Sequence, residues 1–318
     1  MEPEQVTTVS VLEPVGWAIE KVKQILFRPF DLGRWFVIGF CAWLACLDQG
    51  GGFNFNIGRM KFDRYDASLF DKAKDFVTAN LVWIIPTAIT VVLLIIAVGI
   101  VMIWLSSRGK FMFLHCVAEN KAEVKIPWRQ FKVQGDSLFV FRIIASLISF
   151  GFFVLLSFLL VTFIIVLSRA GLKNAAVSVP VIIGIVLFVP LIIAAAIAMA
   201  VFYKFTYDFV VPIMYLRRCT CVQGWREFLA MLSADKGAFT LYILFQIVIS
   251  IAIGMIVMLL FVLGMCLCCC GFFILCIPYI NVVVMLPLVV FKRAYSVCYF
   301  RQFGADFDVF TPRGIVVE

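Results

Sequence analysis

Cysteine is the residue type with the most obvious capacity for chemistry in this sequence of 318 residues, which holds 11 cysteines and one histidine. Five of the cysteines cluster at Cys266, Cys268, Cys269, Cys270 and Cys276. Thiolates in such a cluster could bind Cu(I) or Zn²⁺, or form disulfides in an oxidising compartment. No His or carboxylate accompanies them, and the spacing lacks the paired Cys-x-x-Cys of a structural zinc site. Packing as small apolar side chains is the simpler interpretation, with a disulfide and a metal site as alternatives.

Two further candidates for chemistry lie elsewhere in the chain. Cys219 and Cys221 follow Arg217 and Arg218, whose charges could lower the thiol pKa and favour reversible acylation, although a reduced and inert state is the simpler interpretation. His115 has neither a second His nor a partner carboxylate in its sequence pattern, which makes it a poor catalytic candidate. We therefore expect no catalytic residue, no cofactor and no metal, and we expect that the protein is not an enzyme.

The elements that must position these residues are long and apolar. Hydrophobic residues make up 64% of the chain, charged residues make up 14%, and the mean hydropathy is +1.08. A soluble chain could not cover that much apolar surface, whereas about 20 apolar residues in a helix span a bilayer. The sequence predicts an all-α, polytopic membrane helical bundle of six spans arranged as three hairpins. The six segments are Leu32–Leu47, Leu81–Leu105, Leu138–Leu167, Ala175–Tyr203, Ala238–Leu263 and Phe272–Phe291.

Charge supports the six-span count. Residues 32–47 are short for a span, at about 24 Å of helix against a hydrocarbon core of about 30 Å. If all six segments span, 20 of the 27 Lys and Arg residues share one side and 7 the other. If the first segment does not span, the division is 16 to 11. Since cytoplasmic loops are enriched in Lys and Arg, we expect six spans with both termini in the cytoplasm, in the cell (cytoplasmic) membrane.

Two amphipathic helices are predicted outside the spans. Apolar residues recur at helical spacing from Val15 to Leu26, and again from Leu69 to Val77. The first helix is expected to lie along the cytoplasmic lipid interface, with binding of a partner protein as the alternative. Met1–Leu12 lacks Lys, Arg and an apolar core, so we expect no cleavable signal there.

A loose internal repeat accompanies this pattern. Trp128-Arg129-Gln130-Phe131 and Trp225-Arg226-Glu227-Phe228 lie 97 residues apart, and each precedes a Gly and an apolar segment. Trp17 and its helix repeat the order more loosely. We treat residues 1–318 as one integral-membrane domain with possible repeats at 15–127, 128–224 and 225–318.

Polar groups inside the predicted spans are few. All 19 Asp and Glu residues lie outside the six segments, and Arg142 lies one turn from a segment end, where it could snorkel. Gln246 and Asn281 are the strongest polar residues within, and Asn281 lies between Pro278 and Pro287. Either the two amides bond each other across the last hairpin, or they line a solute site in a broken helix.

Several motifs resemble a known group of membrane proteins. Phe209–Met214, Gly224–Phe228 and Lys236–Phe239 resemble the recurring element of the multi-span membrane domains attached to some bacterial glycerophosphodiester phosphodiesterases and of related bacterial families. The segment from Leu286 to Phe300 is similar to the end of those domains. The resemblance covers about a third of the chain and includes no phosphodiesterase domain. It implies a bacterial cytoplasmic-membrane protein and carries over no hydrolase residue.

The sequence favours a non-catalytic membrane protein that organises membrane lipid or a partner protein through a basic, Trp-bearing cytoplasmic face. A nucleic-acid partner is not expected, because the short loops cannot supply a basic folded surface. The alternative function is a permease or channel for a neutral or amphipathic solute, through Gln246 and Asn281. The residues expected on the basic, Trp-bearing face are Trp17, Lys21, Lys23, Trp128, Arg129, Trp225 and Arg226.

Overall fold

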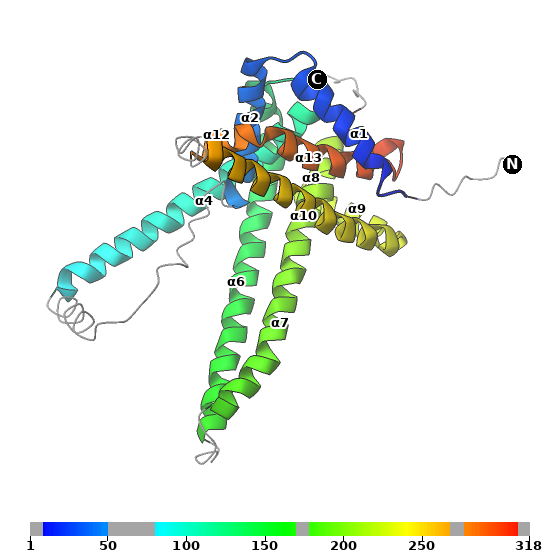
Figure 1. Ribbon diagram of the computed structural model, residues 1–318. Coiled ribbons are helices and arrows are strands. Elements are labelled where there is room, and N and C mark those ends of the chain that lie inside the picture. The colour runs from blue at the N-terminus through cyan, green and yellow to red at the C-terminus, as the bar shows by residue number, and fades with distance from the viewer. Residues whose placement is uncertain (1–8, 50–79, 170–177, 268–276, 311–318) are drawn as a thin grey trace.

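The structure is a computed structural model that describes residues 9–49, 80–169, 178–267 and 277–310. Every regular element in these ranges is helical, which confirms the all-α prediction. Figure 1 shows a compact body, which contains α1, α2, α8 and α13, and three long helices, α4, α6 and α7, that project from it. The predicted helix at Leu69–Val77 lies outside the described residues, as does the turn of the Cys266–Cys276 cluster.

The N-terminal helix forms where the sequence predicts it. Helix α1 (Glu13–Val22) has a Pro in its first turn and continues as the π-helical turn η1 (Lys23–Phe27). Its Ala18 is fully buried, and α1 packs along α13 (Leu286–Arg301). The Tyr295 hydroxyl of α13 donates a hydrogen bond to the Val11 carbonyl at 3.2 Å. Much of its apolar stripe therefore packs against the protein itself, while Trp17 and Ile19 stay exposed, and contact of this helix with the lipid interface stays a prediction.

Helix α2 (Leu32–Cys46) matches the first predicted span and, at 15 residues, is an apolar helix shorter than those long enough to be counted as spans. The Asp31 side chain caps it by accepting a hydrogen bond from the Gly33 amide at 2.8 Å. A single 3₁₀ turn, η2 (Leu47–Gln49), follows directly and carries Asp48. Helix α2 packs against the C-terminal half of the next long helix.

In the described ranges four helices are long and apolar enough to span a membrane: α4 (Leu81–Glu119), α6 (Lys132–Arg169), α7 (Ser178–Phe205) and α10 (Lys236–Leu267). In Figure 1, α6 and α7 run side by side as a hairpin away from the body. Helix α4 continues well past Leu105, where its span was predicted to end. The interval expected to be a basic loop is therefore largely helix, because α4 and α6 carry their charged residues into the body.

Short helices complete the body. Helix α9 begins with a capping box, in which Thr220 and Gln223 satisfy each other's backbone groups. A short helix precedes each of α2, α6 and α10, which is the order that the repeat pattern predicts. The short elements are α5 (Lys125–Gln130), the π-helical turn η4 (Thr206–Val210), α8 (Val211–Arg217), α9 (Cys221–Ala234) and the 3₁₀ turn η5 (Ala305–Phe307).

The last predicted span is broken. Helices α12 (Pro278–Val284) and α13 meet at Met285 with a bend of 66°. Pro278 and Pro287 each lie in the first turn of one of these helices, as expected of residues that cannot continue a preceding helix. The residues of α13 from Arg293 to Phe300 are buried in the body. Among the described residues four helices are long and apolar enough to span a membrane, or five if the bent pair is one span, so the six-span count is not confirmed.

Three of the long helices change from exposed to buried along their length. Helix α4 is exposed from Val82 to Val101, α6 is mostly exposed from Ile144 to Val166, and α7 is mostly exposed from Ile182 to Ala200. These stretches measure about 28 to 35 Å at 1.5 Å per residue, close to the hydrocarbon thickness of about 30 Å. Each stretch ends where its helix enters the body, and we call the region where exposed apolar surface gives way to buried protein the boundary level.

Candidate functional site

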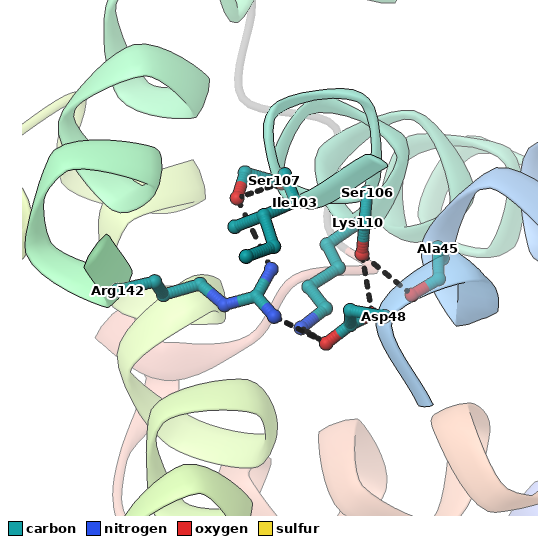
Figure 2. Close-up of polar contacts among 7 residues, drawn as sticks. All are labelled: Ala45, Asp48, Ile103, Ser106, Ser107, Lys110 and Arg142. Carbon is teal, nitrogen blue, oxygen red and sulfur yellow. Dashed lines mark hydrogen bonds and ion pairs between the residues drawn. The ribbon is translucent and has the colours of Figure 1, made fainter. Parts of the chain in front are cut away.

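A buried carboxylate, Asp48, joins η2 to α4 and α6 inside the body (Figure 2). Lys110 of α4 forms an ion pair with Asp48, with Nζ 3.1 Å from Oδ2, and Arg142 of α6 contacts the same oxygen through Nη2. The Ser106 hydroxyl lies within hydrogen-bond distance of Asp48 Oδ1 and of the Ala45 carbonyl. All three charged side chains are at most 10% exposed, so this is an ion-pair network within the protein.

Local sequence explains why these groups meet. A Cβ atom at Gly109 would lie 2.7 Å from backbone atoms of Leu44 and Ala45, so only glycine lets α4 approach α2 this closely. That approach places η2 against the turn of α4 that carries Ser106 and Lys110. Burial alone would raise the pKa of Asp48, but the adjacent cations and the hydroxyl hold this pKa below its usual range.

A second buried carboxylate, Asp208, lies in η4 at the end of α7 and is 1% exposed. It pairs with Lys204, one turn earlier, at 2.8 Å. The Tyr242 hydroxyl of α10 donates to the same Oδ2 atom at 2.8 Å, and the Gln246 amide donates to that hydroxyl at 3.0 Å. The extra residue of a π-helical turn shifts the side-chain register, and such turns are frequent at functional sites.

Both carboxylates line one cavity of about 500 Å³ between α4, α6, α7 and α13. Its wall also carries four cations, which gives a formal excess of two positive charges. It lies at the boundary level, since Ala200 and Ser146 line it where the exposed stretches of α7 and α6 reach the body. The charged residues of the wall are Asp48, Lys110, Arg142, Lys204, Asp208 and Lys292.

A buried arginine, Arg293, packs against the cavity wall. Arg293 of α13 is 1% exposed, and its guanidinium lies 4.4 Å from the ring centre of Tyr207, which lines the cavity. Nη1 donates to the Tyr207 carbonyl at 2.7 Å, but Nε and Nη2 are buried without a hydrogen-bond partner among the described residues. A buried charge without a counter-ion is costly, and this one adds to the positive potential at the cavity.

A family model covers this whole arrangement. The model of a family of unknown function, DUF7544, matches residues 9–310. The chain belongs to this family. Comparisons with curated proteins and with solved structures found no match. The DUF7544 match includes both carboxylates and the four cations of the cavity wall, so the site lies inside the family domain.

The structure distributes the basic, Trp-bearing residues of this DUF7544 chain over three short helices. Trp17 on α1 is 43% exposed, whereas Trp128 and Trp225 are half-buried. Trp128 packs on the Arg108 guanidinium, whose Nη2 donates to both carboxylate oxygens of Asp136, at 2.8 and 2.9 Å. Trp225 stacks on an aromatic ring of α7, and its indole nitrogen is buried with no hydrogen-bond partner in the part of the chain that the structure describes. The basic residues that accompany them, Lys21, Lys23, Arg129 and Arg226, are exposed or half-exposed.

The two intramembrane amides do not pair. Gln246 is buried and bonds Tyr242, so it belongs to the Asp208 network. Asn281 is half-buried in α12, and neither amide lines the cavity. The interpretation in which they hydrogen-bond each other across the last hairpin is therefore wrong for Gln246, whose amide nitrogen has another partner.

The thiol and imidazole candidates are structural. Cys219 and Cys221 are free, and burial raises the pKa of both, to about 12 for Cys221, which reverses the lowering that neighbouring arginines could produce. His115 does have a carboxylate neighbour, since Glu119 lies 3.7 Å away one helical turn later. In the described part of the chain no group of three or more His, Cys, Asp or Glu could hold a metal.

Sequence reasoning missed the buried ionisable groups. Asp48, Lys110 and Asp208 were assigned to loops, and Arg142 was expected to snorkel, whereas its side chain is 10% exposed and points to Asp48. The usable signal was Arg142 itself, because an arginine within an apolar segment requires a counter-charge or a route to water. The identity of the partner was not readable, since Asp48 and Arg142 are 94 residues apart.

Proposed function

We propose that this protein is a non-catalytic membrane protein that holds the polar head of a membrane lipid in the cavity lined by Asp48 and Asp208. The observation that carries the proposal is the level of the cavity. It lies where the exposed apolar stretches of α4, α6 and α7 end, and those stretches match the thickness of a hydrocarbon core. Lipid headgroups occupy that level in a bilayer.

The exposed surface beside the cavity suits lipid chains. An apolar groove of about 680 Å³ runs along α6 and α7 to α9, with Phe152 toward one end and Trp225 toward the other. Adjacent residues such as Phe141 and Arg142 line the groove and the cavity respectively. The helix pair therefore presents apolar groups for acyl chains on one side and polar groups for a headgroup on the other.

The lipid-organising role predicted for the basic, Trp-bearing face becomes a secondary part of this proposal. Trp17 is the exposed member of the three, and Arg129 and Arg226 remain available to anionic lipid. Two of the three Trp rings pack within the protein, so the cavity supports lipid binding better than this face does.

We also propose that both ends of the chain lie on the cytoplasmic side of the cell membrane. The Ser10 amide donates to Gln302 Oε1 at 2.8 Å, and the Gln302 side-chain amide donates to the Ser10 carbonyl at 2.9 Å, so the two ends of the described chain meet. The excess of Lys and Arg in the predicted cytoplasmic intervals supports the orientation.

The permease alternative has one observation in its favour, the 66° break between α12 and α13. Broken helices build solute sites in transporters. Neither Gln246 nor Asn281 lines the cavity, however, so the residues on which that hypothesis rested do not contribute to it.

Filling the cavity tests the proposal. Ala200 lines the cavity, so Ala200→Trp should exclude a headgroup and reduce the lipid that co-purifies with the protein, measured by native mass spectrometry. Ala196→Trp, on the same helix but in neither the cavity nor the groove, is the matched control. Equal retention of lipid by both variants would contradict the proposal.

A further inference from the structure

We propose that the cavity selects a phosphate-bearing headgroup that carries net negative charge and no ammonium group. This inference rests on the proposed function, because it names the class of lipid that the same site takes. The inference rests on two observations. Lys292 and Arg293 form no ion pair with a carboxylate of the described residues, and both carboxylates of the wall already pair with other cations.

Both carboxylates of the wall already have cationic partners. Asp48 already binds Lys110, Arg142 and Ser106. Asp208, which is 1% exposed, receives Lys204 and the Tyr242 hydroxyl on the same oxygen. A primary ammonium needs acceptors for three N–H donors, and it would meet cations whose charge repels it.

Of the two tyrosines that line the cavity, Tyr203 and Tyr207, the Tyr207 ring already holds cations that a quaternary ammonium would have to displace. Such cations are held over aromatic faces, within about 6 Å of a ring centre. The Tyr207 ring already has the Arg293 guanidinium at 4.4 Å and the Lys110 ammonium at 5.3 Å from its centre. A choline group would therefore have to compete with two resident cations for this ring.

An anion in the cavity, in contrast, would lie near cations that have no carboxylate partner among the described residues. Lys292 lines the cavity and forms no ion pair with a carboxylate of the described chain. Arg293 lies behind Tyr207 with two buried nitrogens unpaired, and its charge acts at short range where water is scarce. A phosphate oxygen could bond Lys292 and Lys204 directly, while Arg293 contributes through the field. Phosphate monoesters and phosphodiesters with an uncharged alcohol fit this requirement.

The test measures lipid enrichment. The full chain is placed in phosphatidylcholine nanodiscs that contain equal minor amounts of phosphatidylglycerol, phosphatidic acid and phosphatidylethanolamine, and retained lipid is counted by native mass spectrometry. We expect the two anionic lipids to be enriched about tenfold over phosphatidylethanolamine, the ratio given by a single good charge contact. Lys292→Gln should remove most of that preference, and Lys292→Glu, which supplies a carboxylate, should reverse it toward phosphatidylethanolamine.

Lys132→Gln is the control, since it removes an exposed cation that belongs neither to the cavity wall nor to the basic, Trp-bearing face, and it should leave the preference unchanged. Equal enrichment of anionic and zwitterionic lipids would overturn the selectivity and leave lipid binding intact. If no lipid class is enriched and Ala200→Trp does not change the amount of retained lipid, the proposed function itself would be overturned.

Inorganic phosphate is titrated separately. If it binds as tightly as the lipids and with the same sensitivity to Lys292→Gln, a free phosphate compound is the ligand and the lipid source is overturned.

Discussion

At the scale of single residues, Asp48 is the shared counter-ion of two buried cations. It neutralises Lys110 and Arg142, which would otherwise be two like charges buried side by side. Removing one partner of a buried ion pair leaves uncompensated charge and typically destabilises a protein by about 3 to 5 kcal/mol. An exposed pair such as Arg28 with Glu20, at 3.9 Å, is worth about 0 to 1 kcal/mol.

Asp48→Asn should therefore lower the thermal midpoint of the detergent-solubilised protein by several degrees or abolish folding. Glu20→Gln should leave the midpoint almost unchanged. Thermal unfolding of the two variants beside wild type provides the measurement. Similar midpoints for all three would show that the Asp48 ion pairs contribute nothing to stability.

The pKa of Asp48 sets a pH dependence with a definite sign. Because the folded-state pKa is depressed below the ordinary value of about 3.9, the carboxylate stabilises the fold at every pH above that value. The contribution is lost only as pH falls through the folded-state pKa. We expect thermal stability to show no loss from Asp48 between pH 5 and pH 8 and a decline below about pH 4. A titration centred near pH 6 that disappears in Asp48→Asn would contradict this assignment.

Cys221 is expected to be inert. Its thiol is fully buried and its pKa is raised to about 12, so almost none of it is thiolate at neutral pH. In the folded protein at pH 7.5, maleimide should modify Cys221 far more slowly than after denaturation, as followed by peptide mass spectrometry. Rapid modification of Cys221 in the folded state would show that this segment opens.

At the scale of elements, the close contact of α2 with α4 positions the network. Gly109 has no room for a Cβ atom, whereas a Cβ atom at Gly99, in the exposed part of the same helix, would meet nothing within 4 Å. Alanine at Gly109 must therefore push α2 and η2 away from Ser106. Alanine at Gly99 only improves the helix propensity.

Gly109→Ala should destabilise the protein by about 1 to 3 kcal/mol, as overpacking does, while Gly99→Ala should be neutral or stabilising by up to about 1 kcal/mol. Thermal unfolding of the two variants under one detergent condition makes the comparison. Equal changes in stability would mean that α2 and α4 lie farther apart than the structure shows. In the structure a Cβ atom at Gly109 would be 2.7 Å from the α2 backbone.

Helix positions were predictable because hydropathy and periodicity are local. The N-terminal helix, the four long helices and the break near Pro278 and Pro287 all follow from residues close in sequence. Their ends were not predictable in the same way, since α4 and α6 stay helical after the apolar pattern stops. Hydropathy places the end of a predicted span at the first charged residue. The helix itself continues past that residue, because the charged side chains find partners inside the body.

At the scale of the whole molecule, the body and the projecting helices differ in the residues that they bury and expose. The body buries aromatic and charged residues from both ends of the chain, while the exposed stretches of α4, α6 and α7 present apolar surface of bilayer length (Figure 1). The site was not predictable from the sequence, because it joins η2, α4, α6, η4 and α13 through contacts between residues far apart in the chain. Asp208 and Tyr242, for example, are 34 residues apart and on different helices.

The meeting of the two ends gives a topological prediction. Because Ser10 and Gln302 bond each other, tags fused at the two ends should be reached by a membrane-impermeant reagent from the same side, the cytoplasmic one. Labelling in intact cells and in inverted vesicles measures this. Tags reached from opposite sides would contradict the packing of α1 on α13.

The central claim is that the cavity holds a lipid head at the membrane boundary. The most direct measurement is an experimental structure of the purified chain in native-lipid discs, with the bound lipid identified by mass spectrometry. We predict headgroup density between Lys204 and Lys292, with acyl chains that follow α6 and α7 along their exposed stretches. A cavity filled only with water, with the lipid boundary at another level of these helices, would contradict the account.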